Sequence, residues 1–178
     1  ANDGRLTLNP VPHIHPVGTL LFPLIGAMLG GFIFGWAKPV PIDPRNFSNE
    51  KWGNVIVAAS GPATTLLLSF ISVIIVFAMG DVPDTSPMIA FFRLAKAMIM
   101  VNAILAIFNM IPVYPLDGGV VLYQFLSYEL KQKYDQYVVP YGNIALLGLM
   151  FLGGFAWIGQ MAGIWIFFSS RVVTSVMG

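Results

Sequence analysis

The sequence predicts an all-α membrane protein, a polytopic bundle of transmembrane helices with about four spans plus broken or re-entrant segments. Hydrophobic residues make up 57% of the 178 residues and charged residues 10%, and the mean hydropathy is +0.78. A soluble domain carries about 25% charged residues. Four stretches contain no Asp, Glu, Lys or Arg, and each can hold the roughly 20 apolar residues that cross a hydrocarbon core. These stretches are residues 6–37, 52–80, 97–116 and 136–170.

Composition also excludes several kinds of partner and site. The formal net charge is +1 and no basic stripe interleaved with aromatic residues is present, so we exclude nucleic acid as a partner. The chain has no cysteines, which excludes disulfides, thiolate zinc sites and thiol catalysis, so any metal must be held by His, Asp or Glu. The sequence has no internal repeat and no low-complexity segment, and we expect a single membrane domain over residues 1–178.

The first part of the chain is expected to contain a polar segment that leads to the membrane, one transmembrane span and a stiff loop. Residues 1–16 contain three prolines, which favour an extended or turn-rich backbone. Residues 18–37 form the first expected span, whose glycines offer a small-residue face to another helix. Residues 38–51 hold three prolines and five charges and are expected to form an exposed, extended loop.

The second expected span, residues 52–80, carries a proline in mid-membrane. The pair Gly61-Pro62 favours a kink, which is tolerated only where neighbouring helices or hydroxyls satisfy the freed backbone groups. Ser60, Thr64 and Thr65 lie close enough in sequence to supply such hydroxyls.

Three further segments complete the expected bundle. Residues 88–111 form the third span, with two basic residues near its start that can snorkel to the interface. Residues 127–137, "SYELKQKYDQY", are polar and aromatic and suit a segment lying along the membrane surface. Residues 138–170 form either one tilted span or two shorter pieces divided near Gly153-Gly154, and the sequence leaves both open.

The distribution of charge predicts an orientation in the membrane. With four spans, the loops 38–51 and 114–137 share one side and hold five Lys and Arg residues. The opposite side has Arg5 and Arg171, with Arg93 and Lys96 at a helix start, and it also carries Asp81 and Asp84. This modest bias places the side that contains Asp117 in the cytoplasm.

The stretch 109–119, "NMIPVYPLDGG", ends an uncharged run with a carboxylate, Asp117. One interpretation is structural, with Asp117 capping a helix that begins at Gly118. Against it, two prolines break the helix just before the acid, and two glycines allow close backbone approach just after it. An ionised Asp at membrane depth costs roughly 2.5–3.5 kcal/mol, so it usually faces a cation, a water cavity or a metal.

Six short motifs follow one another along almost the whole chain. They are "GRLTLNP" (4–10), "HIHPVGT" (13–19), "GWAKPVP" (35–41), "PRNF" (44–47), "SGPATTLLLS" (60–69) and "NMIPVYPLDGG" (109–119). With these motifs the chain resembles the site-2 protease family of intramembrane zinc metalloproteases, in its compact prokaryotic branch without a PDZ domain. The resemblance implies an integral protein of a prokaryotic cell membrane that cleaves transmembrane protein substrates within the lipid bilayer.

The resemblance also implies a set of site residues. Zinc would be held by two histidines of an H-E-x-x-H helix and by the aspartate of a Leu-Asp-Gly motif, which is Asp117 in this sequence. The glutamate of that helix would act as general base on a zinc-bound water. Five further residues are expected to line the substrate site or its cavity: Asn109, Pro112, Gly118, Gly61 and Thr65.

The sequence departs from the family's pattern in two ways. It contains no H-E-x-x-H, and its two glutamates, Glu50 and Glu129, have no histidine beside them. The chain alone therefore lacks the catalytic base and two zinc ligands and should be inactive. Thr65 stands where the family commonly has asparagine, and His15 where it often has aspartate, which puts some substrate contacts in doubt.

Two functions remain open from the sequence. In the family the H-E-x-x-H helix precedes "GRLTLNP", so the first reading is a zinc protease whose N-terminal part lies outside this sequence. The second is a catalytically inactive homologue, a structural or assembly subunit of a membrane complex without metal. A third function, a transporter or channel with Asp117 in its ion path, ranks last, because the sequence lacks paired inverted half-repeats and a second intramembrane acid. His13 and His15 are expected to bond backbone carbonyls rather than zinc.

Overall fold

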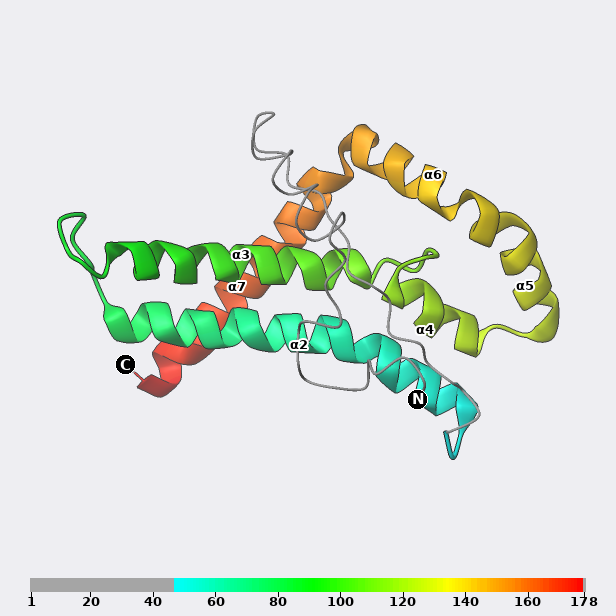
Figure 1. Cartoon of the computed structure of the whole chain (residues 1–178), viewed down its shortest axis with the longest axis horizontal. Helices are drawn as coiled ribbons and strands as arrows, with labels where there is room; N and C mark the ends of the chain where they lie inside the picture. The colour runs from blue at the N-terminus through cyan, green and yellow to red at the C-terminus, as the bar shows by residue number, and fades with distance from the viewer. Residues whose placement is uncertain (1–46, 178) are drawn as a thin grey trace, which may run out of the picture. The chain divides into compact units, whose positions relative to one another are not determined.

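The computed structural model describes residues 47–177, which lie in one compact unit, and every regular element in them is a helix (Figure 1). The elements are α2 (Glu50–Met79), α3 (Ile89–Asn109), α4 (Asp117–Phe125), α5 (Tyr128–Lys133), η4 (Tyr134–Val138), α6 (Val139–Leu149), η5 (Met150–Gly154) and α7 (Phe155–Met177). The predicted helical class is therefore confirmed for this part of the chain. The expectations for residues 1–16, 18–37 and most of 38–51, for the two histidines and for one domain over the whole chain lie outside the described residues.

Helices α2 and α3 form an antiparallel pair that corresponds to the second and third predicted spans (Figure 1). Within residues 47–177 they are the two helices that are long and apolar enough to cross a membrane. Helix α2 starts where the Asn49 side chain accepts a hydrogen bond from the Trp52 amide at 3.1 Å, which satisfies one of the free amides of the first turn. It ends at Gly80, whose φ of 61° suits glycine. The number of spans in the whole chain stays a prediction.

Helix α2 runs without interruption through Pro62. Hydroxyls near the proline bond to backbone carbonyls of their own helix: Ser60 Oγ donates to Val57 at 2.7 Å, and Thr64 Oγ1 donates to Ser60 at 2.7 Å. Proline removes the helical donor of the Ala58 carbonyl, and these hydroxyls reach other carbonyls than that one. The hydroxyls of Ser60, Thr64 and Thr65 therefore do not replace the lost hydrogen bond, contrary to the expectation from the sequence.

Helix α7 packs across both α2 and α3. An apolar cluster of Val73, Ile99 and Val173 joins the three helices. Beside it Ser69, which is fully buried, donates to the Ile99 carbonyl at 2.9 Å and accepts from Trp165 Nε1 at 3.2 Å. Hydrogen bonds between helices in lipid contribute about 0.6 kcal/mol on average. One serine therefore joins three helices beside their apolar cluster.

The last uncharged stretch is divided into two helical pieces. Gly153, inside η5, has a φ of 94°, a conformation that L side chains rarely adopt. Of the two possibilities left open by the sequence, the structure contains the division near Gly153-Gly154. The preceding segment 127–137 is helical, in α5 and η4, and its placement along the membrane surface stays a prediction.

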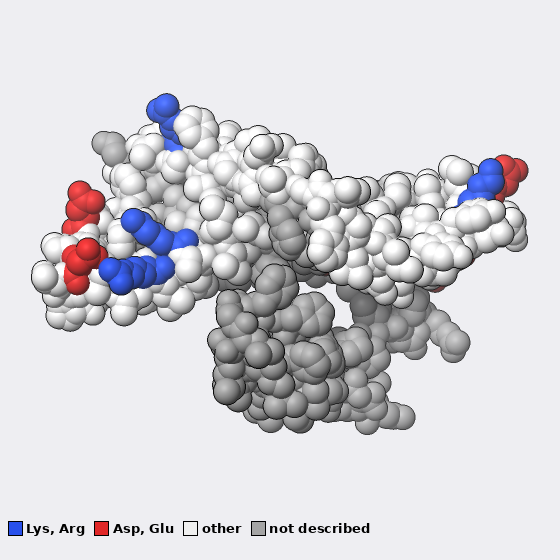
Figure 2. Space-filling model, turned by 90° about the horizontal axis from the view of Figure 1, so that it is seen from above, with Lys and Arg blue, Asp and Glu red and all other residues white. Residues whose placement is uncertain are grey.

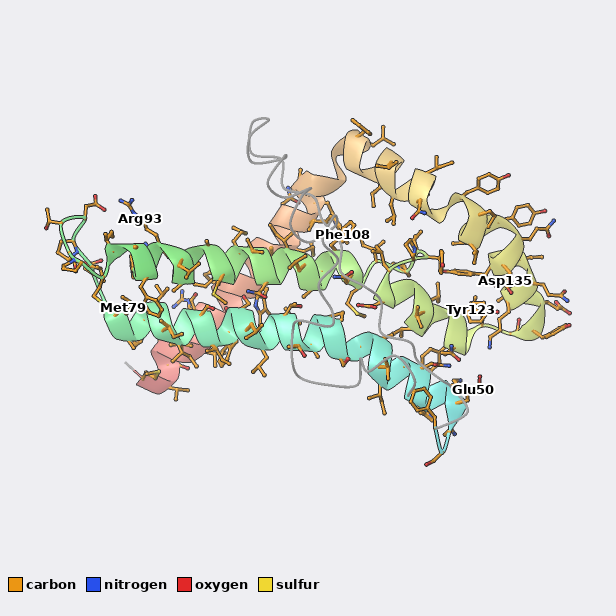
Figure 3. The ribbon with its side chains drawn as sticks, viewed as in Figure 1. Glu50, Met79, Arg93, Phe108, Tyr123 and Asp135 are labelled. Atoms are coloured by element: carbon orange, nitrogen blue, oxygen red, sulfur yellow. The ribbon has the colours of Figure 1, made fainter. Side chains whose placement is uncertain are left out.

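Charged side chains gather toward two ends of the face shown in Figure 2, with uncharged surface between them. At one end Arg93 bonds Asp84 at 2.9 Å. The opposite end holds Glu50, Tyr123 and Asp135 (Figure 3). The start of α2 and the α4–α5 region therefore share one end, as predicted for the two loops, and which side of the membrane this end faces stays a prediction.

Candidate metal centre around Asp117

The turn between α3 and α4, residues 110–116, breaks the helix immediately before Asp117. Its backbone forms short-range hydrogen bonds, Val113 N to the Ile111 carbonyl at 2.8 Å and Leu116 N to the Val113 carbonyl at 3.0 Å. Ile111 and Leu116 are buried in a cluster with Leu146 of α6 and Ile158 of α7. These two side chains anchor the turn in the apolar interior, while Met110, Pro112, Tyr114 and Pro115 are exposed.

Glycines allow three close backbone contacts to this turn. A β-carbon at Gly118 would overlap the Met110 carbonyl, and one at Gly119 would lie 2.7 Å from the Tyr114 amide nitrogen. On α6, a β-carbon at Gly142 would overlap the Tyr114 carbonyl oxygen. The close approach predicted for the two glycines after Asp117 is confirmed. The contact at Gly142 was not predicted, because it depends on α6 returning to the turn.

Asp117 is the first residue of α4, and the residue in the cap position is Leu116. No side-chain capping bond forms there, so the interpretation that Asp117 caps a helix beginning at Gly118 is wrong. Within residues 47–177 the carboxylate has no hydrogen-bond or ion-pair partner. Both oxygens are therefore available to a ligand as far as the described residues are concerned.

Helix α2 brings Gly61 against this carboxylate. A β-carbon at Gly61 would lie 3.1 Å from Asp117 Oδ2, so two of the predicted site residues, far apart in sequence, are neighbours in the fold. Gly118, another of the predicted site residues, directly follows Asp117 in α4. Thr65 Oγ1 donates to the Pro62 carbonyl at 3.0 Å and Asn109 Nδ2 to the Leu105 carbonyl at 2.9 Å. The latter two side chains bond within their own helices, and their predicted role at the cavity stays a prediction.

A large apolar hollow opens beside the turn, with a volume of about 780 Å³. Its wall includes Pro112, Leu66 of α2 and three α7 residues, Trp157, Met161 and Trp165. Pro112, one of the predicted site residues, thus lines a cavity. The composition of this wall suits apolar side chains rather than a charged ligand.

On the other side of the turn, Tyr134 is 7% exposed and begins the π-helical segment η4. Its hydroxyl lies 2.8 Å from the position of a β-carbon at Gly119, close to the Tyr114 backbone, yet has no partner of hydrogen-bonding geometry among residues 47–177. Burial raises the pKa of Tyr134. Nearby, Tyr123 donates its hydroxyl to Asp135 at 3.0 Å, which raises the Tyr123 pKa (Figure 3).

The described residues do not by themselves make a zinc site, and Asp117 is the candidate ligand among them. Catalytic zinc takes three protein ligands and leaves one position open. Asp117 fits one of these, as a carboxylate without a partner in this part of the chain. Residues 47–177 contain no group of three or more His, Cys, Asp or Glu that could hold a metal, so the other ligands would have to come from outside them.

Comparison with known proteins identifies relatives. The chain matches "Peptidase family M50" over residues 79–152, which include Asp117 and its turn. It is 33% identical over 150 residues to "Putative zinc metalloprotease YwhC" of Bacillus subtilis (strain 168), an alignment that covers 83% of this chain and 65% of that protein. It is 31% identical over 121 residues to "Putative zinc metalloprotease sll0528" of Synechocystis sp. (strain ATCC 27184 / PCC 6803 / Kazusa), covering 61% of this chain and 30% of that protein.

The chain therefore spans less than two thirds of the length of either relative. No solved structure matches it significantly. The family match covers the Asp117 turn, and the longer alignment covers most of the chain. On these grounds the chain belongs to peptidase family M50, the site-2 protease family that its sequence motifs resemble.

Proposed function

We propose that this chain forms part of an intramembrane zinc metalloprotease that cleaves transmembrane protein substrates, with Asp117 as one of three zinc ligands. The observation that carries the proposal is the setting of Asp117: a carboxylate without a partner in residues 47–177, at a helix break, facing Gly61. The two relatives are both named "Putative zinc metalloprotease", and these names support the same reaction.

The remaining machinery would come from a segment outside these 178 residues. The sequence contains no H-E-x-x-H, so two histidine ligands and the glutamate base must be supplied by that segment. Bound zinc would lower the pKa of a water molecule and polarise the scissile carbonyl. Asp117 would anchor the metal on this chain, and the glycine contacts at Gly118, Gly119 and Gly142 would hold Asp117 in place.

The setting of this reaction is also part of the proposal. The protein would lie in a prokaryotic cell membrane with the Asp117 end toward the cytoplasm. The backbone polar groups of the broken helix before Asp117 would offer hydrogen bonds to water that an unbroken apolar helix does not. The hollow beside Pro112 supplies an apolar surface next to this approach.

One observation favours a second function. Within residues 47–177 Asp117 is not joined by other metal-binding side chains, and the printed sequence lacks the family's catalytic motif. A catalytically inactive homologue, acting as a structural or assembly subunit of a membrane complex, is consistent with both facts. In that case Asp117 would bind no metal.

The zinc content of the native polypeptide separates the two functions. The full-length gene product, purified from its membrane in mild detergent, should contain about one zinc ion per molecule by inductively coupled plasma mass spectrometry. Treatment with 1,10-phenanthroline should remove the metal and stop cleavage, and added zinc should restore both. A full-length polypeptide free of zinc and unchanged by added zinc would favour the structural subunit.

Substituting Gly61 by valine should weaken zinc binding without unfolding the protein. The new β-carbon would lie 3.1 Å from Asp117 Oδ2, and the branched methyl groups would push the carboxylate aside. Changes next to a metal ligand cost about 10–100-fold in metal affinity. The matched control is Ala63→Val, an exposed position on the same helix. Zinc affinity, measured by competition with a chelator, should fall only in Gly61→Val; equal affinities would show that the two side chains do not meet.

A further inference from the structure

A polar pocket lies at the start of α2, away from Asp117, and we propose that it binds the phosphate headgroup of an anionic membrane lipid. The pocket has a volume of about 680 Å³. Lys51 of α2 and Lys131 of α5 both line it, although they are far apart in sequence. We call it the Lys51–Lys131 pocket. The proposal does not depend on zinc or on proteolysis.

Aromatic rings of α4 lie under both ammonium groups. Lys51 Nζ lies 4.5 Å from the centre of the Phe125 ring, and Lys131 Nζ lies 4.9 Å from the centre of the Tyr123 ring. Cations at these distances are attracted to the ring face. Tyr123 itself lines the pocket, whereas Phe125, two residues further along α4, does not. Each ring therefore holds one lysine, and the pocket lining brings the two lysines together.

The rest of the wall adds hydrogen-bond donors suited to a phosphate. Asn54 and Gln124 contribute side-chain amides. Asn49 uses its carbonyl oxygen to accept from Trp52, which leaves its NH₂ group for a ligand. Glu50 is the one acid that lines the pocket, so with two lysines the wall keeps a formal charge of +1. Ammonium and amide donors together match the acceptor oxygens of a phosphodiester.

The position of the pocket points to a lipid rather than a soluble anion. It lies where α2, a helix long and apolar enough to cross a membrane, begins. Trp52 and Phe125 pack edge to face at 6.0 Å next to it, and each is 53% exposed. Exposed tryptophan beside lysine is typical of the headgroup level of a bilayer. Figure 3 places Glu50 and Tyr123 at this same end of the unit.

Native mass spectrometry of the full-length protein tests the proposal. The protein is exchanged into micelles with phosphatidylglycerol or phosphatidylcholine at matched concentrations. Wild type should retain one phosphatidylglycerol at least tenfold more tightly than phosphatidylcholine. The double variant Lys51→Gln/Lys131→Gln should lose this preference, and Lys51→Arg/Lys131→Arg should keep it. The matched control Lys133→Gln, an exposed lysine of α5 that does not line the pocket, should bind as wild type does.

Two results would overturn the proposal. One is an unchanged lipid preference in the double glutamine variant with wild-type thermal unfolding, which would place the lipid elsewhere. The other is displacement of the lipid by millimolar inorganic phosphate, with no preference among intact lipids, which would assign the pocket to a soluble phosphate. The Arg variant guards against misfolding, since it keeps the charge and the stacking on the aromatic rings.

Discussion

Asparagine in place of Asp117 should abolish zinc retention and cleavage in the full-length protein while leaving its fold unchanged. The substitution removes the negative oxygen that a zinc ligand needs but keeps the size of the side chain against Gly61. Since the carboxylate has no partner within residues 47–177, its loss breaks no structural contact there. We expect zinc affinity to fall by more than about 100-fold, the upper figure for changes beside a ligand.

The measurement combines zinc content, cleavage of a transmembrane reporter and thermal unfolding in the same detergent. Asp135→Asn is the matched control: it removes an exposed carboxylate from η4, whose partner in the described structure is the Tyr123 hydroxyl. Asp135→Asn should retain zinc. If Asp117→Asn stayed loaded with zinc and active, the assignment of Asp117 as a ligand would be wrong.

The elements that sequence predicted well are those whose cause is local. Long apolar stretches cover α2 and α3 because a helix that satisfies its own backbone is the solution for a span in lipid. The break before Asp117 follows from Pro112 and Pro115, which lie close together and each remove a backbone donor, whereas the single Pro62 leaves α2 continuous. The close packing at Gly118 follows from the absence of a side chain.

The features that sequence missed arise from segments that meet only in the fold. Nothing around Ser69 indicates that its hydroxyl bonds Ile99 of one helix and Trp165 of another. Tyr134 resembles the other tyrosines of a polar segment, yet the path of η4 buries it behind the turn. The capping interpretation of Asp117 failed for a related reason. The backbone of Leu116, with φ −75° and ψ 157°, lets the helix start one residue earlier than the polar side chain suggests.

Alanine in place of Gly142 provides the sharpest test of how the Asp117 turn is held. Helix propensity alone predicts stabilisation, since glycine inside a helix is about 1 kcal/mol worse than alanine. The structure predicts the opposite sign, because the new methyl group would overlap the Tyr114 carbonyl oxygen. Forcing an extra methyl into a packed contact costs typically about 1–3 kcal/mol and shifts the backbone. The displaced Tyr114 backbone would carry the rest of the turn and Asp117 with it. Zinc affinity should therefore fall together with the melting temperature.

Gly148 of the same helix supplies the control, because a β-carbon there meets nothing within 4 Å. Gly148→Ala should therefore raise the free energy of unfolding by about 0.5–1 kcal/mol, as propensity predicts. Two glycines of one helix should thus respond to the same substitution with opposite signs. Thermal unfolding of both variants in one detergent measures this difference directly. Equal stabilisation of both would mean that α6 does not press on the turn, and that Asp117 owes its position to α2 and the end of α3 alone.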